Sequence, residues 1–185
     1  MSEVRNIPQF PAAGALALRF APLWPVSLVG ARLARMLAKR HPALFSRLGE
    51  QADKVFVIDP TDLPFVFVLK PRPERPELSA LRRAAAVDWD ARIAGPLAAL
   101  IGLVHGAYDG DALFFSRDLS IEGDTEAVVA LRNAIDNEEL DLVREAMPLF
   151  GPLERLAIAP AQKLAAAIGA VTGVPLSRVE SGRFE

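Results

Sequence analysis

Short β-rich runs in the middle of the chain predict a sheet made of brief strands. Residues 54–59 (KVFVID) and 65–70 (FVFVLK) are two such runs, separated by a five-residue loop that contains two prolines. Runs of this kind joined by so short a loop are typical of an antiparallel hairpin. Pro71, Pro73 and Pro76 then break the pattern, so we expect an irregular edge or loop after the hairpin.

The next segment changes from a strand period to a helix period. Apolar residues alternate with charged ones from Val87 to Ile93, which predicts a strand over residues 87–94 with one buried face. After Gly95-Pro96 the apolar residues recur every three or four positions, which predicts a helix ending at Gly106. The inward strand residues would be Val87, Trp89, Ala91 and Ile93, and the helix stripe Leu97, Leu100, Ile101 and Val104.

Further elements are predicted towards the C-terminus. We expect a short helix over residues 110–116, a strand over 119–122 with Leu119 and Ile121 inward, and a helix over 125–137 capped by Asp124. Helical periodicity continues to Pro148, and a last helix is expected over residues 161–171. The apolar stripe of the capped helix consists of Val128, Leu131 and Ile135.

The N-terminal part is predicted to be a loose arm followed by helices. Residues 1–23 are rich in Pro and Ala without a sustained period, so we expect little regular structure there. Residues 25–41 form an amphipathic pattern, and a short helix over 42–49 follows. Helices, a hairpin, further strands and more helices together favour an α+β fold, with an antiparallel or mixed sheet and helices against one face.

Composition and charge narrow the classes of protein. The 185 residues are 51% hydrophobic and 24% charged, as in a globular protein, and the absence of Cys excludes disulfides, thiolate metal ligands and a cysteine nucleophile. The net charge of −2 gives no indication of nucleic-acid binding. Residues 1–50 carry seven Lys or Arg and two Glu, a balance of +5, whereas the remainder has a balance of −7. We therefore expect different partners for the two parts.

Targeting and membrane-spanning segments are not predicted. The N-terminus does not resemble a signal peptide, and residues 12–29 are interrupted by Arg19, Pro22 and Pro25, which disfavours a spanning helix. We expect a cytoplasmic protein that is either soluble or peripheral on the inner face of the membrane.

The polar residues do not form a recognisable catalytic constellation. His41 and His105 each lie at the end of a predicted helix, where capping or surface polarity explains them. Asp88 and Asp90 point off one strand face, where they could share a proton or bind a hard cation, although a solvated outer face is the simpler interpretation. Zinc, phosphate-loop and nucleophile-elbow motifs are absent from the sequence. We therefore expect no catalytic residue, no metal site and no cofactor.

The sequence of residues 95–126 resembles a known family. The segments GPLAALIGL and GDALFFSRDLSIEGDTE are similar to the sterol carrier protein type-two domain family, and GDALFFSRDLSIEGDTEAVVALRNAIDNEEL is most similar to its bacterial UbiT-like branch of ubiquinone biosynthesis accessory factors. The similarity extends over residues 52–141 and is strongest over 110–137. It implies a sheet of about five mostly antiparallel strands covered by helices, with a hydrophobic tunnel that binds acyl chains, sterols or isoprenoids without altering them.

The resemblance also suggests a ligand and a set of residues that would line its tunnel. The ligand would be a hydrophobic lipid, an isoprenoid ubiquinone precursor or a fatty acyl chain. From the residues alone, an ordinary filled core explains the same apolar side chains. Phe114 and Phe115 are adjacent, so they could clamp two sides of a cavity or divide between core and loop. The expected lining is Trp89, Ile93, Leu100, Ile101, Val104, Phe114, Phe115, Leu119, Ile121, Val128 and Leu131.

Three regions and two functions follow from these observations. Residues 1–50 would be an arm with basic amphipathic helices, 51–148 the lipid-binding domain, and 149–185 a C-terminal helical extension. The protein would present isoprenoid precursors to ubiquinone biosynthesis enzymes, or else act as a structural adaptor that tethers such enzymes without a lipid cavity. The basic helix could meet an anionic membrane, pack on its own domain or mediate dimerisation. Its expected membrane-surface residues are Trp24, Arg32, Arg35, Lys39 and Arg40.

Overall fold

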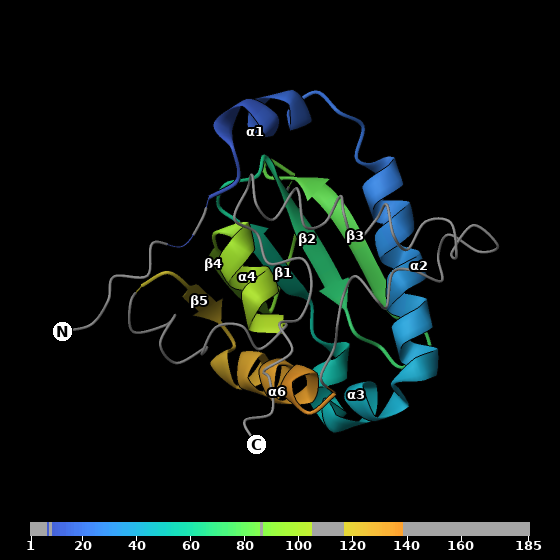
Figure 1. Ribbon diagram of the computed structural model, residues 1–185. Helices are drawn as coiled ribbons and strands as arrows, with labels where there is room; N and C mark the ends of the chain where they lie inside the picture. The colour runs from blue at the N-terminus through green and yellow to red at the C-terminus, as the bar shows by residue number, and fades with distance from the viewer. Residues whose placement is uncertain (1–6, 8, 86, 105–116, 139–185) are drawn as a thin grey trace, which may run out of the picture.

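A computed structural model describes residues 7, 9–85, 87–104 and 117–138 of the chain (Figure 1). The predicted helices at 110–116 and 161–171, the extension to Pro148 and the region 149–185 therefore lie outside the described residues. The described elements, in chain order, are α1 (Ala12–Leu18), α2 (Trp24–Arg40), α3 (Pro42–Arg47), the 3₁₀ helix η1 (Gly49–Asp53), β1 (Phe56–Pro60), β2 (Phe65–Lys70), β3 (Glu77–Arg82), β4 (Ala91–Gly95), α4 (Leu97–Val104), β5 (Ser120–Gly123) and α6 (Thr125–Asp136).

The strands form one mixed sheet in the order β3-β2-β1-β4-β5. The pairs β1–β2, β2–β3 and β4–β5 are antiparallel, while β1 and β4 pair in parallel. The α+β class, the five strands and the hairpin over residues 54–70 are thus confirmed. The edge strand β3 was not predicted, because ELSALR lacks a β-branched or aromatic run and follows three prolines closely.

The strand predicted over residues 87–94 is shorter than expected. Its ladder begins at Ala91, where the carbonyl of Val55 accepts hydrogen bonds from the backbone N–H groups of Asp90 (2.9 Å) and Ala91 (3.3 Å). Trp89 precedes the strand and is 39% exposed. Alternation predicted the correct face for Ala91 and Ile93 but extended the strand four residues too far towards the N-terminus.

Helices cover one face of the sheet, as the sequence predicted. In Figure 1, α4 lies over β1 and β4, while α3 and α6 lie together at the lower end of the sheet. The buried cluster on this side, which we call the inner cluster, consists of Leu44, Phe45, Leu48, Ala52, Phe56, Ala91, Ile93, Ala99, Leu100, Leu119, Ala127, Val128, Leu131 and Ala134.

The N-terminal arm is more ordered than its composition suggested. Residues 12–18 form the helix α1 instead of a loose arm. The guanidinium of Arg82, at the end of β3, donates to the carbonyl of Leu18 at 2.8 Å and to the carbonyl of Ala21. Leu18 also packs, with Phe10, against a small apolar cluster around Phe65. These contacts from a distant strand are absent from any local pattern, which is why periodicity missed the helix.

Helix α2 runs along the open side of the edge strand β3 (Figure 1). The hydroxyl of Ser27 donates to the carbonyl of Ala80 at 3.2 Å and accepts from its N–H at 2.9 Å. Gly30 allows the close approach, since a Cβ there would lie 2.9 Å from the carbonyl oxygen of Leu78. The helix thereby shields backbone groups that would otherwise form an exposed sheet edge.

Among the described residues, the helices are too short or too polar to cross a membrane.

The Ser27 contact gives a first stability prediction. Replacing Ser27 with Ala removes both hydrogen bonds to β3 and leaves two backbone groups without their partner. We expect the free energy of unfolding to fall by about 2 kcal/mol, measured by urea denaturation. The control is S46A, whose exposed hydroxyl bonds only the local carbonyl of Ala43 and should cost less than about 0.5 kcal/mol. Equal losses in the two variants would show that Ser27 does not hold α2 on the sheet edge.

Candidate functional site

The structure brings most of the predicted lining residues together on the helix-covered face. Five of them, Ile93, Leu100, Leu119, Val128 and Leu131, belong to the inner cluster and are at most 7% exposed. Val104 and Ile121 are half-buried and pack against that cluster, and Ile101 is a half-buried residue of α4 outside it. Trp89 lies outside the cluster, while Phe114 and Phe115 lie outside the described residues.

Small side chains fill the contact between α4, α6 and the sheet. Ala91, Ala99 and Ala127 are fully buried, and Ala134 is 1% exposed. Alanines let helix and sheet approach closely, because each projects only one methyl group into the contact. This part of the inner cluster is therefore packed directly.

A neighbouring strip of half-buried apolar side chains was not predicted as part of the site. Register places Ile58 of β1 opposite Phe67 of β2, and Phe56 opposite Leu69, so these side chains share the face of the inner cluster. Ile58 and Leu69 pack against that cluster, whereas Phe67 packs against the apolar cluster around Phe65. We call Ile58, Phe67 and Leu69 the β2 strip. The alternation within FVFVLK could have identified its two β2 residues.

Helices stand around the β2 strip. In Figure 1, α1 lies above β2 and β3, α2 to the right, α3 and α6 below, and α4 to the left. Helix α4 has the sequence LAALIGLV, so apolar or small groups occupy all of its sides. Leu103 and Val104 are half-buried against the inner cluster. The described surroundings of the strip are thus suited to hydrocarbon and supply little to bind a polar ligand.

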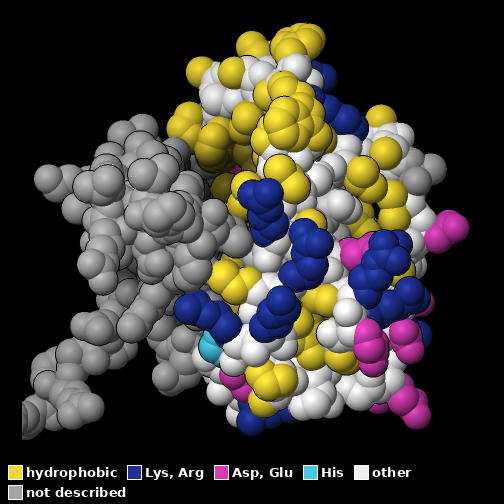
Figure 2. Space-filling view, turned by 90° about the vertical axis from the view of Figure 1, so that its right-hand side faces the viewer, with side chains coloured by type: hydrophobic (Ala, Val, Ile, Leu, Met, Phe, Trp, Pro, Cys, Tyr) yellow, Lys and Arg dark blue, Asp and Glu magenta, His cyan; other side chains and the backbone are white. Residues whose placement is uncertain are grey.

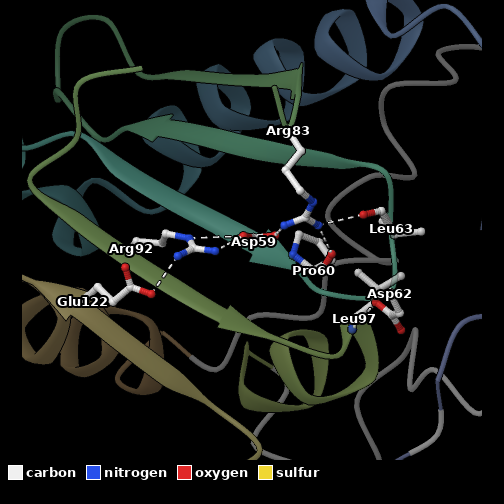
Figure 3. Close-up of polar contacts among 8 residues, drawn as sticks. All are labelled: Asp59, Pro60, Asp62, Leu63, Arg83, Arg92, Leu97 and Glu122. Atoms are coloured by element: carbon white, nitrogen blue, oxygen red, sulfur yellow. Dashed lines mark hydrogen bonds and ion pairs between the residues drawn. The ribbon is translucent and has the colours of Figure 1, made fainter. Parts of the chain in front are cut away.

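Asp62, in the loop between β1 and β2, fixes the start of α4 (Figure 3). Its Oδ1 accepts a hydrogen bond from the N–H of Leu97 at 2.9 Å, and its Oδ2 accepts one from the N–H of Phe10 at 2.8 Å. One carboxylate therefore caps α4 from another element and ties the N-terminal segment to the same point.

Asp59 occupies the opposite face of the sheet and is the one buried charged residue among the described residues. Its carboxylate pairs with Arg83 and accepts bonds from Arg92, with Nη2 at 2.5 Å and Nε at 3.1 Å (Figure 3). Arg92 also contacts Glu122 at 2.7 Å, and Arg83 donates to the carbonyls of Pro60 (2.9 Å) and Leu63 (2.8 Å). Hydrogen bonds to Asp59 are the main cause that raises the pKa of Arg92. The charges are mutually satisfied, as in a structural network.

A second polar cluster joins the start of β4 to α6. Asp90 accepts a hydrogen bond from the N–H of Val55 at 2.8 Å, and Lys54 lies 3.7 Å from Asp90 and 3.4 Å from Asp124. Asp124 caps α6 by accepting from the N–H of Ala127 at 3.0 Å, which confirms the predicted cap. That backbone hydrogen bond, followed by Lys54, lowers the pKa of Asp124. Asp90 is therefore engaged within the fold, whereas Asp88 is exposed.

His41, which could also have had a catalytic or metal-binding role, contacts an acidic side chain. His41 follows the last residue of α2, and its Nδ1 lies 3.1 Å from Oε2 of Glu138. The other carboxylate oxygen of Glu138, Oε1, lies 3.2 Å from Nη1 of Arg47. His105 lies outside the described residues. Within the described part of the chain, no three His, Asp or Glu side chains form a group that could hold a metal ion.

The predicted membrane-surface residues lie on the outer side of the molecule. Trp24 is 68% exposed, and Arg32, Arg35, Lys39 and Arg40 are all exposed on α2. Figure 2 shows Lys and Arg side chains running below a group of hydrophobic side chains on this side.

Comparisons with known proteins agree on the type of domain. Residues 33–136, more than half of the chain, match the model of the SCP-2 sterol transfer family. No curated protein matches the sequence.

The solved structures that are similar to this chain have low sequence identity to it. A "UbiJ-SCP2 Ubiquinone synthesis protein" is 22% identical, with a TM-score of 0.50, over 64% of this chain and 96% of that chain. Apo sterol carrier protein 2 from Yarrowia lipolytica is 16% identical, with a TM-score of 0.42, over 62% of this chain and 92% of that chain. The sterol carrier protein domain 2 of Helicoverpa armigera is 13% identical, with a TM-score of 0.42, over 58% and 82%.

The Asp59 network predicts a large effect of a small substitution. Asp59→Asn keeps the side-chain size but leaves two arginines without their buried counter-charge. We expect the free energy of unfolding to fall by about 3 kcal/mol in urea denaturation. Asp53→Asn is the control, because Asp53 is 83% exposed and pairs with Arg72 on the surface. A cost below about 1 kcal/mol for Asp59→Asn would contradict the structural role of the network.

The lowered pKa of Asp124 predicts a pH dependence. A carboxylate with a lowered folded-state pKa stabilises the fold fully above its ordinary pKa of 3.8, and the contribution is lost as pH falls through the folded value. Asp124→Ser retains a cap that does not titrate in this range. We expect the difference in unfolding free energy between wild type and this variant to be constant above pH 5 or so and to shift against the wild type below that, in urea titrations at several pH values. A difference independent of pH would contradict the assignment.

Proposed function

Because the chain belongs to the SCP-2 sterol transfer family, we propose that it is a non-catalytic lipid-binding protein that holds isoprenoid precursors of ubiquinone as an accessory factor of ubiquinone biosynthesis. The sequence resemblance of residues 110–137 to the UbiT-like branch directs the choice of ligand. The similar solved structure named as a ubiquinone synthesis protein points to the same pathway.

The observation that carries the proposal is the β2 strip beside the inner cluster. Ile58, Phe67 and Leu69 are half-buried apolar side chains on a face whose buried described residues are all apolar. The charged network around Asp59 lies on the other face. A hydrocarbon chain against the strip would bury apolar surface without leaving a charge or an amide unpaired.

The energetics favour a long hydrocarbon tail. Each buried CH₂ contributes about 0.8 kcal/mol, so a five-carbon isoprene unit contributes roughly 4 kcal/mol when fully buried. Association costs roughly 4 to 15 kcal/mol in lost freedom. One unit therefore barely offsets this cost, whereas several units give useful affinity. A prenyl tail of several units suits this site without any specific hydrogen bond.

The carboxylates near the candidate site have structural roles, which favours a binding function over a catalytic one. Asp59, Asp62 and Asp124 are each occupied by hydrogen bonds that hold elements together. Covalent catalysis would require a carboxylate that activates a nucleophile, whereas these three carboxylates serve the fold.

The alternative function is a structural adaptor that tethers biosynthetic enzymes. The directly packed alanines between α4, α6 and β4 favour a filled interior in that part of the fold. In the adaptor hypothesis the β2 strip would be part of a filled core, and the protein would bind partner proteins but no lipid.

Lipid occupancy separates the two functions. The full chain is purified, extracted with organic solvent and examined by mass spectrometry for prenylated phenols and quinones. Binding of added prenylated phenols with one to eight isoprene units is then measured by titration calorimetry. The proposal expects affinity to increase with tail length over the first several units. Absence of lipid in the extract, together with no binding at any tail length, would favour the adaptor.

Substitutions locate the ligand on the proposed face. Leu69→Gln and Val104→Gln each place an amide against the expected hydrocarbon, and we expect at least tenfold weaker binding of the prenylated phenol. Val129→Gln is the matched control, since Val129 is 55% exposed on α6 and should leave binding unchanged. Circular dichroism checks that each variant is folded. Unchanged affinity in folded Leu69→Gln and Val104→Gln would place the ligand elsewhere.

A further inference from the structure

We propose that α1 and the N-terminal end of α2 form a tip that docks end-on into an anionic lipid bilayer. The tip is defined by the exposed apolar residues Leu16, Phe20, Trp24, Leu28 and Val29. All five precede the family match at residues 33–136, so the tip is an addition to the lipid-binding domain. The proposal concerns how the protein meets a membrane and does not depend on which ligand it carries.

The tip is the most strongly exposed apolar surface of the described chain. Phe20 is 87% exposed, Trp24 68% and Leu16 56%, while Val29 and Leu28 are 51% and 42% exposed. In Figure 1, α1 and the start of α2 lie at the same end of the molecule, and Figure 2 shows hydrophobic side chains gathered there. Contiguous exposed apolar side chains of this size mark an interaction surface.

The exposed side of α2 changes from apolar to basic along the helix axis. Trp24, Leu28, Arg32, Arg35 and Lys39 follow one another at spacings of four, four, three and four residues, so they share one side of the helix. The first two are apolar and the last three are basic. A helix that lies flat in the membrane interface has its apolar residues on one side and its basic residues on the other. A stripe divided end to end suits a helix whose N-terminal end enters the bilayer first.

The distance of each basic residue from the tip predicts how much that residue contributes to membrane binding. With a rise of 1.5 Å per residue, Arg32 lies about 12 Å and Lys39 about 22 Å from Trp24 along the axis. The headgroup layer is roughly 5 to 8 Å thick, and screening at physiological salt acts over about 8 Å. With the tip at the hydrocarbon boundary, Arg32 reaches the headgroups and Lys39 lies beyond most of their field.

The fold holds the tip in place. The bonds from Arg82 to the carbonyls of Leu18 and Ala21 fix the turn on both sides of Phe20. Leu23 and Val26 pack inward against the cluster around Phe65, which leaves Phe20 and Trp24 directed outward. A turn fixed in advance presents its aromatic side chains without an added ordering cost on binding.

The positive charge near the tip favours an anionic membrane as its binding partner. Residues 1–50 have a balance of +5, Arg19 is exposed beside Phe20, and the first turn of α2 contains no acidic residue. Aromatic residues favour the interfacial region of a bilayer, and basic residues bind anionic headgroups. A second copy of the chain would bring the same positive charge to the contact, which opposes association through this surface.

The experiment uses the full chain and vesicles of phosphatidylcholine with or without 30% phosphatidylglycerol. In flotation assays we expect binding to the anionic vesicles that weakens as salt is raised. Phe20→Ser with Trp24→Ser should reduce binding at least tenfold, whereas Val129→Ser, an exposed apolar position outside the tip, should leave it unchanged. Both substitutions at the tip affect exposed side chains, and circular dichroism checks the fold. Lack of binding to anionic vesicles would overturn the proposal.

Single charge reversals test the end-on orientation. We expect Arg32→Glu to weaken vesicle binding about tenfold and Lys39→Glu less than threefold, with Arg35→Glu between them. Equal losses in the three variants would show that α2 lies flat and would overturn the end-on geometry. Tryptophan fluorescence should shift to the blue on binding in the wild type, and the shift should be lost in Trp24→Phe, which keeps an aromatic residue at the tip. Formation of a dimer that the tip substitutions dissociate would instead assign the surface to a second copy.

Discussion

The structure depends on how the buried charge of Asp59 is satisfied on one face of β1, while the other face of this strand is apolar. Asp59 is buried on one face, where Arg83 and Arg92 compensate its charge, and Phe56 and Ile58 point to the other. Burying a carboxylate without such partners would cost several kcal/mol. Because Arg83 in the β3–β4 connection and Arg92 on β4 satisfy Asp59, the opposite face can remain apolar. The inner cluster and the β2 strip lie on this apolar face.

The same hairpin also places the helix that borders the site. Three residues after Asp59, Asp62 caps α4 and holds the segment around Phe10. The polar residues near the candidate site therefore support its walls and leave the ligand-facing surface to aliphatic and aromatic side chains. This division of labour is suited to a protein that holds a lipid, since a hydrocarbon tail gains nothing from polar groups and would leave them unpaired.

Local patterns predicted the elements better than the contacts between them. Periodicity and capping residues located β2, α2 and α6 to within about one residue, because their signals lie within the elements themselves, and they located the start of α4, whose predicted end at Gly106 lies outside the described residues. Helix α1 and strand β3 were missed because Arg82 and Ser27 stabilise them from distant segments. The predicted lining residues were concentrated on β4, α4 and α6, whereas Phe67 and Leu69 of the β2 strip were missed although the alternation within FVFVLK indicates them, and strand register adds Ile58. The buried role of Asp59 could not be read from a sequence in which it ends a β-rich run like any surface residue.

The central claim is that a prenyl chain lies against the β2 strip on the helix-covered face. Isotope-filtered nuclear Overhauser spectroscopy on methyl-labelled protein with an unlabelled prenylated phenol tests this most directly. The account predicts contacts from the ligand's tail to the methyl groups of Ile58, Leu69 and Val104, and none to those of Val57, Val66 and Val68 on the opposite face. Contacts confined to the opposite face, or to no methyl group of either face, would contradict it.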